Sequence, residues 1–308
     1  MTTPIIIDCD PGQDDAVAVL TALGSPELEV LAITAVHGNV PLSRTAANAR
    51  ALVEFAGRPE VPVYAGCDRP LRRPAIHVIR IHGESGLQGF TPPPARRAIE
   101  TAHAAEFIVE TLKARDGVTL AVLGPMTNIA AAFTWAPEVA KRVKRIVLMG
   151  GGRGVGNITP VAEFNIYVDP DAADLVFRAG VPTVMIGLDT TWQALTTPAR
   201  LKAWRETGGK AGQAAAAMYD NPARYDARRY GEAGLPLHDP CVIAYLLRPD
   251  LFEGRDCHVA IETGSPLTLG QTVVDWWGTT GKPANAKVLS RVDADGYFKL
   301  LTERLGRL

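Results

Sequence analysis

The sequence predicts an α/β protein built on a single open, mainly parallel, Rossmann-like sheet with helices on both faces. Three observations lead to this prediction. Strand and helix patterns alternate along most of the 308 residues, of which 47% are hydrophobic, enough for a large core. No linker rich in Pro, Gly or Ser interrupts the pattern, so we expect one domain over residues 1–308. Polar clusters follow several strands, which predicts a site at the carboxyl ends of the strands.

The elements follow in chain order from the apolar pattern. Apolar runs predict strands at residues 5–7, 28–36, 61–65, 118–123, 143–149 and 181–186. A helix is expected at residues 16–23, and helical stretches lie between most of the later strands, which implies right-handed crossovers. Helices are also expected at residues 211–218 and 241–247. Short strands at residues 258–262, 272–276 and 286–292 and a helix from residue 294 should extend the same domain.

Loops and composition narrow the function classes. Residues 68–98 and 219–237 are rich in Pro, Gly and Arg, and long loops of this kind are expected to act as lids. The net charge of -1 gives no electrostatic footprint for nucleic acid or a membrane surface. No leader and no apolar stretch near ~18 residues is present, so we expect a cytoplasmic protein. The cysteines form no CxxC pair, which fits free thiols.

The most informative motif is a group of four carboxylates that directly follows the first predicted strand: Asp8, Asp10, Asp14 and Asp15. Strand alternation puts Asp8 and Asp10 on one face, while Asp14 and Asp15 open the next helix at its positive end. Two carboxylates about 4 Å apart repel by about 4 kcal/mol at an effective dielectric of about 20, so the group needs a cation unless it is protonated. All-oxygen ligands favour calcium or magnesium over zinc. Helix capping alone would leave Asp8 and Asp10 unexplained.

Further polar groups follow the later strands. They are His37-Gly-Asn39, the glycine-rich stretch 150–157, Glu163-Phe164-Asn165 and His238-Asp239-Pro240. The glycine-rich stretch does not match GxGxxG, which excludes a dinucleotide fingerprint, and its glycines let the backbone approach a ligand. Read locally, the Glu163 triplet is equally typical of a surface turn, and Asp239 before Pro240 is equally typical of a helix N-cap.

Taken together, these motifs resemble those of the inosine-uridine preferring nucleoside hydrolases, and the resemblance spans nearly the whole chain. The matching segments are Asp8-x-Asp10-Pro-Gly-x-Asp14-Asp15-Ala16, Gly38-Asn39, His82-Gly-Glu-Ser-Gly86, Gly124-Pro-Met-Thr-Asn128, Leu148-Met-Gly-Gly-Gly152, Glu163-Phe-Asn165 and His238-Asp-Pro240. The resemblance implies an enzyme that cleaves the N-glycosidic bond of ribonucleosides with water and uses a tightly bound Ca²⁺ ion.

The resemblance also implies roles for individual residues. The calcium ligands would be three carboxylates and one main-chain carbonyl: Asp10, Asp15, Asp239 and Leu123, with Asp8 behind them. The ribose 2′ and 3′ hydroxyls would be held by Asp14, Asn39 and Asn165. Asn157 and Glu163 would contact the 5′-hydroxyl, and Met149 and Phe164 would pack against the sugar. His82 and His238 would face the base.

The chemistry of the residues agrees with these roles. Cleavage of a glycosidic bond develops positive charge on the sugar and electron density on the base, and a carboxylate-rich pocket suits the first. Asp10 is the candidate general base for the water that the metal positions. His238 is the candidate acid for a purine leaving group, a role suited to an intrinsic pKa near ~6.5. Binding both ribose hydroxyls should exclude 2′-deoxynucleosides.

The base preference and several alternatives stay open. In having His238, the chain resembles the branch of the family that accepts inosine and uridine or pyrimidines. The purine-specific branch stacks the base between tryptophans, and Trp192 and Trp204 do not clearly fall at those positions. Tyr225 and Tyr230 of the second lid loop are candidate base contacts. The alternatives are a hydrolase of a modified riboside, a nucleoside-binding protein without turnover, and a haloacid-dehalogenase-type phosphatase, which would want a lysine near its phosphate. The resemblance further implies a homodimer or homotetramer.

Overall fold

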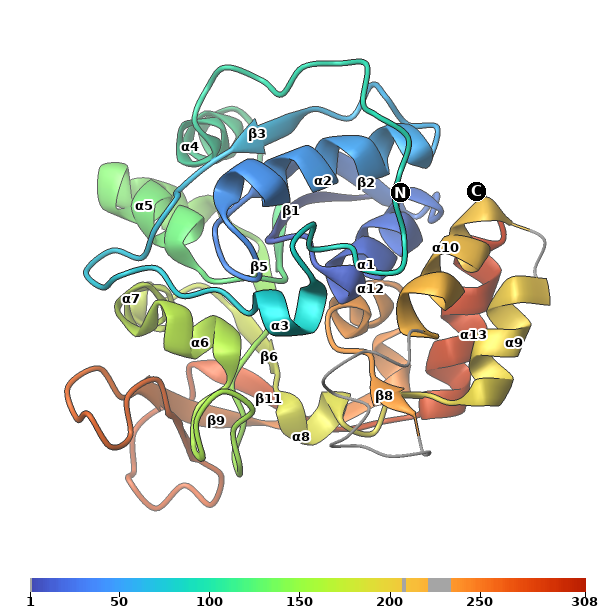
Figure 1. Ribbon diagram of the computed structural model, residues 1–308. Helices are drawn as coiled ribbons and strands as arrows, with labels where there is room; N and C mark the ends of the chain where they lie inside the picture. Colours follow the sequence, from blue (N-terminus) through green and yellow to red (C-terminus); the bar gives the residue numbers. More distant parts are fainter. Residues whose placement is uncertain (1, 207–208, 221–233) are drawn as a thin grey trace.

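The computed structural model describes residues 2–206, 209–220 and 234–308, which form one α/β domain around a nine-stranded sheet (Figure 1). Across the sheet the strands are β10 (Thr272–Asp275), β9 (Phe252–Ile261), β11 (Ala286–Val292), β6 (Thr183–Ile186), β5 (Arg145–Met149), β4 (Thr119–Val122), β1 (Thr3–Cys9), β2 (Leu28–Ala35) and β3 (Val63–Ala65). All neighbours from β11 to β3 pair in parallel, and β9 and β10 pair antiparallel at one edge. The predicted fold class is confirmed.

Helices cover both faces of the sheet (Figure 1). One face carries α1 (Gln13–Leu23), α2 (Leu42–Phe55), α9 (Pro198–Glu206), α10 (Lys210–Tyr219), α12 (Pro240–Leu247) and α13 (Ala294–Leu305). The other carries α4 (Ala104–Ala114), α5 (Thr127–Trp135), η1 (Pro137–Arg142) and α7 (Pro170–Arg178). Ile5 and Ile7 belong to the first core and Ile6 to the second, which explains why β1 is apolar without a break before its acids.

The acidic motif lies where the strand order reverses. Strand β1 has β2 on one side and β4 on the other, so the chain leaves β1 toward one edge and later returns to build the other half of the sheet. Crevices outside the carboxyl ends of the strands at such a point are where open α/β sheets bind ligands. The fold therefore presents Asp10 and the start of α1 to a natural binding crevice.

Several short elements were not expected from the sequence. They are α3 (Ile79–His82), α6 (Phe164–Val168), α8 (Leu188–Thr191), η3 (Pro249–Leu251) and the two-stranded sheet of β7 (Leu195–Thr196) and β8 (Leu235–Pro236). Strand β9 also begins earlier than the predicted residue 258. The first half of β9 is polar and mostly exposed, so its sequence shows no apolar pattern typical of a strand. Its extended conformation is stabilised by antiparallel pairing with β11.

Two predictions about the surface can be compared with this fold. The first predicted lid loop, 68–98, contains α3. Most of the second, 219–237, lies outside the described residues, and so do Tyr225 and Tyr230. Within the described part of the chain, no helix has the length and apolar character needed to cross a bilayer, and all four cysteines are free thiols.

Candidate active site

Asp10 is buried at the carboxyl end of β1 and fits closely between two glycines. Its Oδ2 atom accepts a hydrogen bond of 2.7 Å from the backbone N–H of Asn39. A Cβ atom on Gly38 would lie 2.0 Å from Oδ2, and one on Gly124 would lie 2.3 Å from Oδ1, so neither position tolerates a side chain. The Oδ1 atom is buried without a hydrogen-bond partner among the described residues. One oxygen of Asp10 therefore remains for a ligand.

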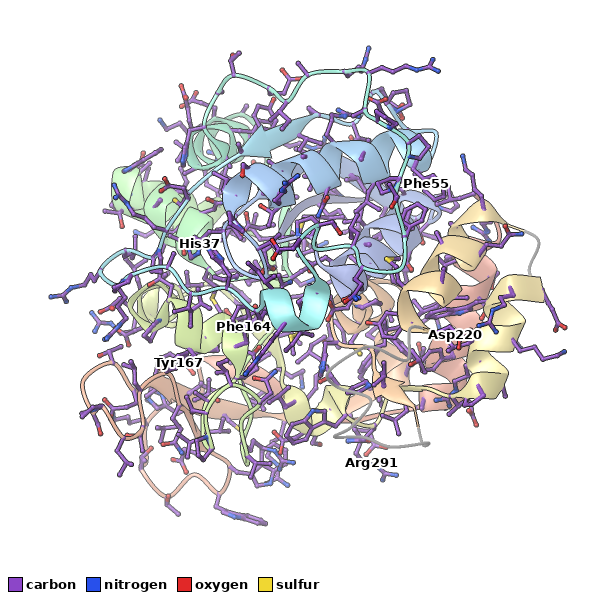
Figure 2. The ribbon with its side chains drawn as sticks, viewed as in Figure 1. His37, Phe55, Phe164, Tyr167, Asp220 and Arg291 are labelled. Carbon is purple, nitrogen blue, oxygen red and sulfur yellow. The ribbon has the colours of Figure 1, made fainter. Side chains whose placement is uncertain are left out.

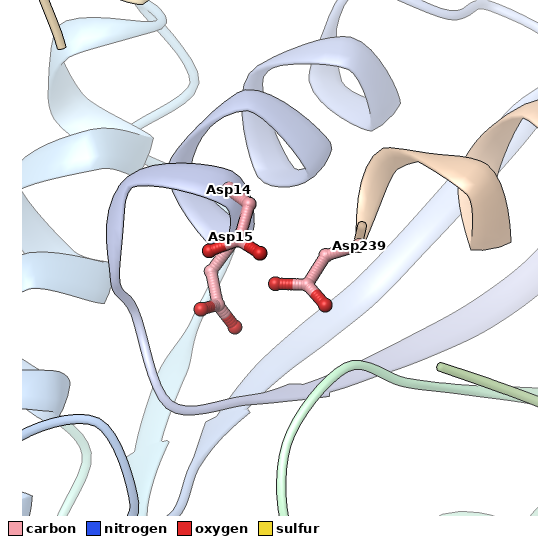
Figure 3. Close-up of side chains that lie close together, drawn as sticks. All are labelled: Asp14, Asp15 and Asp239. Atoms are coloured by element: carbon pink, nitrogen blue, oxygen red, sulfur yellow. The ribbon is translucent and has the colours of Figure 1, made fainter. Parts of the chain in front are cut away.

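Asp14, Asp15 and Asp239 converge from two helices. Their carboxylates each offer an oxygen within 4.8 Å of the others. Figure 3 shows the Asp239 side chain, at the start of α12, directed toward the first turn of α1. Asp239 occupies the N-cap position of α12 but its side chain makes no capping bond. The capping alternative therefore does not account for Asp239.

Asp15 combines capping with membership of this cluster. Its Oδ2 atom accepts from the backbone N–H of Gly12 at 2.9 Å, and its Oδ1 atom accepts from the backbone N–H of Asp10 at 3.2 Å. Both bonds fix the turn that joins β1 to α1. Asp15 can therefore cap α1 and still belong to the acidic cluster, because each of its carboxylate oxygens has two lone pairs.

Burial makes this cluster electrostatically costly. It raises the pKa of Asp15 to about 7 and the pKa values of Asp10 and Asp239 well above their usual range, and repulsion from neighbouring carboxylates adds to the effect. A cation would reverse that balance, since it stabilises the charged form. The donors are all hard oxygens, and Asp10 Oδ1 lacks a partner, so the residues present fit Ca²⁺ or Mg²⁺. The geometric cluster includes Asp14, whereas the resemblance implied Asp10 in its place.

Amide side chains hold the surrounding groups in position. Asn39 Nδ2 donates to the carbonyl of Asp10 and to Asp15 Oδ2, both at 3.1 Å. Asn165 Nδ2 donates to the carbonyl of Leu123 at 2.7 Å and to that of Met149 at 3.2 Å. The Leu123 carbonyl keeps a second lone pair. Both amides therefore connect neighbouring strand ends, and their Oδ1 atoms remain as acceptors.

Asp8 lies farther back in the sheet. Its Oδ1 atom accepts from Thr34 Oγ1 at 2.6 Å and from Asn128 Nδ2 at 2.8 Å, and Asn128 Oδ1 accepts from the backbone N–H of Cys67. Burial raises the pKa of Asp8 to about 7. Asp8 is therefore a buried link between β1, β2 and α5, behind the acids that face the crevice, and Asn128 is a contact that its motif alone did not identify.

Glu163 is a buried acceptor for backbone groups. Its carboxylate accepts from the N–H groups of Gly151, Asn165 and Ile166 at 2.9, 2.9 and 3.2 Å, which caps α6 and fixes the glycine turn after β5. Gly151 has a φ of 72°, which favours glycine. Asn157 Oδ1 accepts from the N–H of Phe164 at 2.9 Å. The Glu163 triplet is thus a buried cap and not a surface turn, and burial raises the pKa of Glu163 to about 7.

A cavity is lined by many of these groups, but not by Asp8, Asp10 or Asp15. Of the predicted site residues, those that line it are Asp14, Asn39, His82, Leu123, Met149, Asn157, Glu163, Phe164, Asn165, His238 and Asp239. The residues that sequence reasoning missed are Val78, Arg80, Ile81, Ile158 and Pro236. Three of them come from α3 or its start, inside a segment predicted as loop. The apolar residues of that segment, such as Val78 and Ile81, could have indicated that part of the loop packs against the rest of the protein.

The lining of the cavity combines polar and apolar side chains. It includes acids and amides, and it also includes Val78, Phe164, Ile81 and Ile158, which pack in an apolar cluster with Val168. Figure 2 shows Phe164 beside α3. Trp204 is buried in the core against Phe298, and neither it nor Trp192 is among the described cavity-lining residues.

Comparison with known proteins decides the family. The family model described as inosine-uridine preferring nucleoside hydrolase matches residues 5–299. The chain belongs to this family. Among its relatives, an uncharacterised protein of Schizosaccharomyces pombe is 48% identical over 99% of both chains. The pyrimidine-specific ribonucleoside hydrolase RihA of Shewanella sp. (strain ANA-3) is 45% identical over 99% of this chain and 96% of that protein.

Solved structures of the nucleoside hydrolases have the same fold. The purine-preferring ribonucleoside hydrolase from Gardnerella vaginalis superposes with a TM-score of 0.91 at 35% identity, covering 98% of each chain. Membership of the family makes the protein a ribonucleoside hydrolase, an enzyme that cleaves N-glycosidic bonds. The phosphatase and the binding protein without turnover, considered from the sequence, are therefore set aside.

Proposed function

We propose that the protein is a calcium-dependent ribonucleoside hydrolase with a preference for pyrimidine nucleosides. The observation that supports a calcium ion is the convergence of the partly buried Asp14 with the buried Asp15 and Asp239 near the sheet switch point. Asp10 Oδ1 lacks a hydrogen-bond partner among the described residues. The relative of Shewanella sp. named pyrimidine-specific, at 45% identity over almost the full length, supports the base preference. The Gardnerella vaginalis neighbour named purine-preferring is less similar, at 35%.

The proposed calcium ligands are Asp10, Asp15, Asp239 and the carbonyl of Leu123, with Asp14 close enough to join them. When bound, the ion would neutralise these carboxylates and position a water molecule and the ribose 2′ and 3′ hydroxyls. Asn39 and Asn165 offer acceptor oxygens to the hydroxyls, and Glu163 and Asn157 line the cavity where the 5′-hydroxyl would lie. Met149 and Phe164 would contact the sugar ring.

The reaction balances with one base and one acid. The glycosidic bond breaks, and its electron pair leaves with the nucleobase. A water oxygen bonds to the anomeric carbon while Asp10 takes one water proton. A proton from His238 goes to the departing base, which leaves neutral. Asp10 then releases its proton to solvent and His238 takes one up, so that the enzyme is restored and the products are ribose and free base.

The base end of the cavity supports the role of His238. His238 and His82 both line the cavity, with Ile81 and Pro236 beside them. Pyrimidines expose ring carbonyl and N–H groups that histidine side chains can bind. A modified riboside is the alternative substrate, since only contacts at this end would distinguish it. We further propose that the 68–98 loop acts as a lid, because its helix α3 lines the cavity, and that the enzyme is a homodimer or homotetramer.

The test is a substrate panel. Purified enzyme is incubated with uridine, cytidine, inosine and adenosine, before and after calcium is stripped, and free ribose and base are quantified without added phosphate. Calcium-dependent release of ribose, fastest with uridine and cytidine, is the expected result. Faster release from inosine and adenosine would contradict the pyrimidine preference. No release from any of the four would direct attention to a modified riboside.

A further inference from the structure

A buried hydroxyl is hydrogen-bonded to the ring of His238. Thr191 Oγ1 lies 2.7 Å from His238 Nδ1, and Thr191 is completely buried at the end of α8. We propose that Thr191 is a positioning residue that holds the imidazole of His238 so that its other nitrogen, Nε2, serves the leaving base. This inference rests on the proposed acid role of His238. It assigns a function to a side chain that would not itself touch the substrate.

The fold brings the two residues together from distant points of the chain. After α8 the chain runs through α9 and α10 and returns at β8, where Leu195 pairs with Pro236. The backbone N–H of Leu237 donates to the carbonyl of Ala194 at 2.9 Å, and the Tyr297 hydroxyl donates to the carbonyl of Leu237 at 3.2 Å. The backbone on both sides of the contact is therefore fixed. The bond to Thr191 restricts rotation of the His238 side chain.

A hydroxyl suits this position because its oxygen accepts a hydrogen bond from Nδ1–H without adding a negative charge beside the ring. While the ring carries a proton on both nitrogens, Nδ1–H donates to Thr191 Oγ1. When the Nε2–H bond breaks and the proton passes to the base, Nδ1 keeps its hydrogen and continues to donate to Thr191 Oγ1. The hydroxyl keeps its own proton throughout, so the proton balance of the reaction is unchanged. A carboxylate in the same place would hold the ring protonated and oppose the transfer.

The chain supplies a matched control in the adjacent residue. Thr190 lies on the same short helix and is also completely buried, but its hydroxyl has no hydrogen-bond partner among the described residues. Replacing either threonine with valine removes one hydroxyl of the same size from the same helix. Only the change at Thr191 removes the bond to His238. A difference between the two variants therefore reports on that bond and not on the stability of α8.

The test compares two substrates that differ in their need for an acid. Uracil leaves poorly without a proton, whereas the p-nitrophenolate of p-nitrophenyl β-D-ribofuranoside leaves as a stable anion. We expect Thr191→Val to lower kcat on uridine about tenfold to a hundredfold, a part of what general-acid catalysis contributes. Its kcat on the nitrophenyl riboside should be unchanged. Thr191→Ser should restore uridine hydrolysis, and Thr190→Val should match the wild type on both substrates.

Every other outcome contradicts either the positioning role of Thr191 or the acid role of His238. Equal losses on both substrates in Thr191→Val would show a structural role, and unchanged uridine hydrolysis would remove the positioning role. The variant His238→Ala distinguishes a failure of the positioning role of Thr191 from a failure of the proposed acid role of His238. If that variant hydrolyses uridine as fast as the wild type, the acid role of His238 fails, and the role of Thr191 fails with it. If His238→Ala loses uridine hydrolysis but Thr191→Val does not, the positioning role alone is overturned.

Discussion

The proposed ribose end and the proposed base end of the cavity are built in different ways. At the ribose end, Asp10 directly follows β1, Asn39 lies in the connection after β2 and Asn165 lies in the first turn of α6. Each is tied to a neighbouring strand end by hydrogen bonds. At the base end, Ile81 and His82 come from a four-residue helix within a long loop, and His238 from the segment after β8. The residues proposed for the common chemistry thus lie near the strand ends, and those proposed to select the base lie on longer connections.

This difference teaches where change is tolerated. The ribose end combines buried charge with hydrogen bonds that involve the ends of four strands, so one substitution there leaves polar groups unsatisfied. The base end relies on apolar surface from α3 and on histidines in connecting segments, which can change without disturbing the sheet. The two ends should therefore respond to perturbation with effects of different size, and the following experiments test that expectation from the largest effect to the smallest.

The largest effect is expected from removing one hydroxyl of the substrate. With 2′-deoxyuridine in place of uridine, we expect kcat/KM to fall about 10⁴-fold, because a site built to bind a hydroxyl rejects the analogue that lacks it. Steady-state assays of free base released measure this ratio. Cytidine is the control, since it alters only the base end and should cause a much smaller change. Comparable turnover of uridine and 2′-deoxyuridine would show that the ribose end does not select its substrate.

The next effect concerns the proposed base. Asp10→Asn keeps an acceptor for the N–H of Asn39 but removes the proton acceptor, so kcat on uridine should fall about 10³-fold. Nucleoside binding, measured by calorimetry, should persist, and metal analysis should confirm that calcium is still bound. Asp68→Asn, at a side chain that is 74% exposed, is the matched control and should leave kcat unchanged. Unimpaired hydrolysis by Asp10→Asn would remove Asp10 as the base.

Calcium removal should lower stability as well as activity. At a calcium concentration about 100 times its Kd, binding adds about 2.7 kcal/mol to the free energy of unfolding. Chemical denaturation with and without a chelator measures that difference. Ile81→Ala, a change at the base end, should show the same calcium-dependent increment as the wild type. If the chelator leaves the unfolding curve unchanged, no structural cation is held by the acids.

The smallest effect is expected at the apolar wall. Ile81→Ala should change the ratio of kcat/KM for uridine to that for inosine by about tenfold, a typical value for the loss of a few apolar groups from a pocket. Ile79→Ala is the control, because Ile79 lies on the same helix but is not among the described residues that line the cavity. Discrimination against 2′-deoxyuridine should persist in both variants. Its loss in Ile81→Ala would show that the two ends are not independent.

The sequence predicted the fold and the ribose end because both leave local signals. Asp8, Asp10, Asp14 and Asp15 follow an apolar strand at a spacing that only a cation site or a costly repulsion explains. The base end left weaker signals. Helix α3 has only four residues, too few to show a helical period, and it lies in a segment rich in Pro and Arg.

Contacts between distant segments could not be predicted from local sequence patterns. The position of Asp239 beside Asp14 and Asp15 follows from the packing of α12 against α1, and only the family resemblance indicated it in advance. Thr191 had no signal at all, since a threonine in a short helix is ordinary until the return of the chain at β8 brings His238 to it. The roles of these residues remain predictions.

The close fit of Asp10 between Gly38 and Gly124 has a consequence for how such a sequence can evolve. Gly38 and Gly124 belong to different crossovers, yet both face the same carboxylate at distances that a methyl group would violate. A mutation to alanine at either glycine could be compensated by a shorter residue at position 10, but that compensation would delete the proposed base. Substitutions at Gly38, Gly124 and position 10 should therefore depend on one another, although the three positions lie on different segments of the chain.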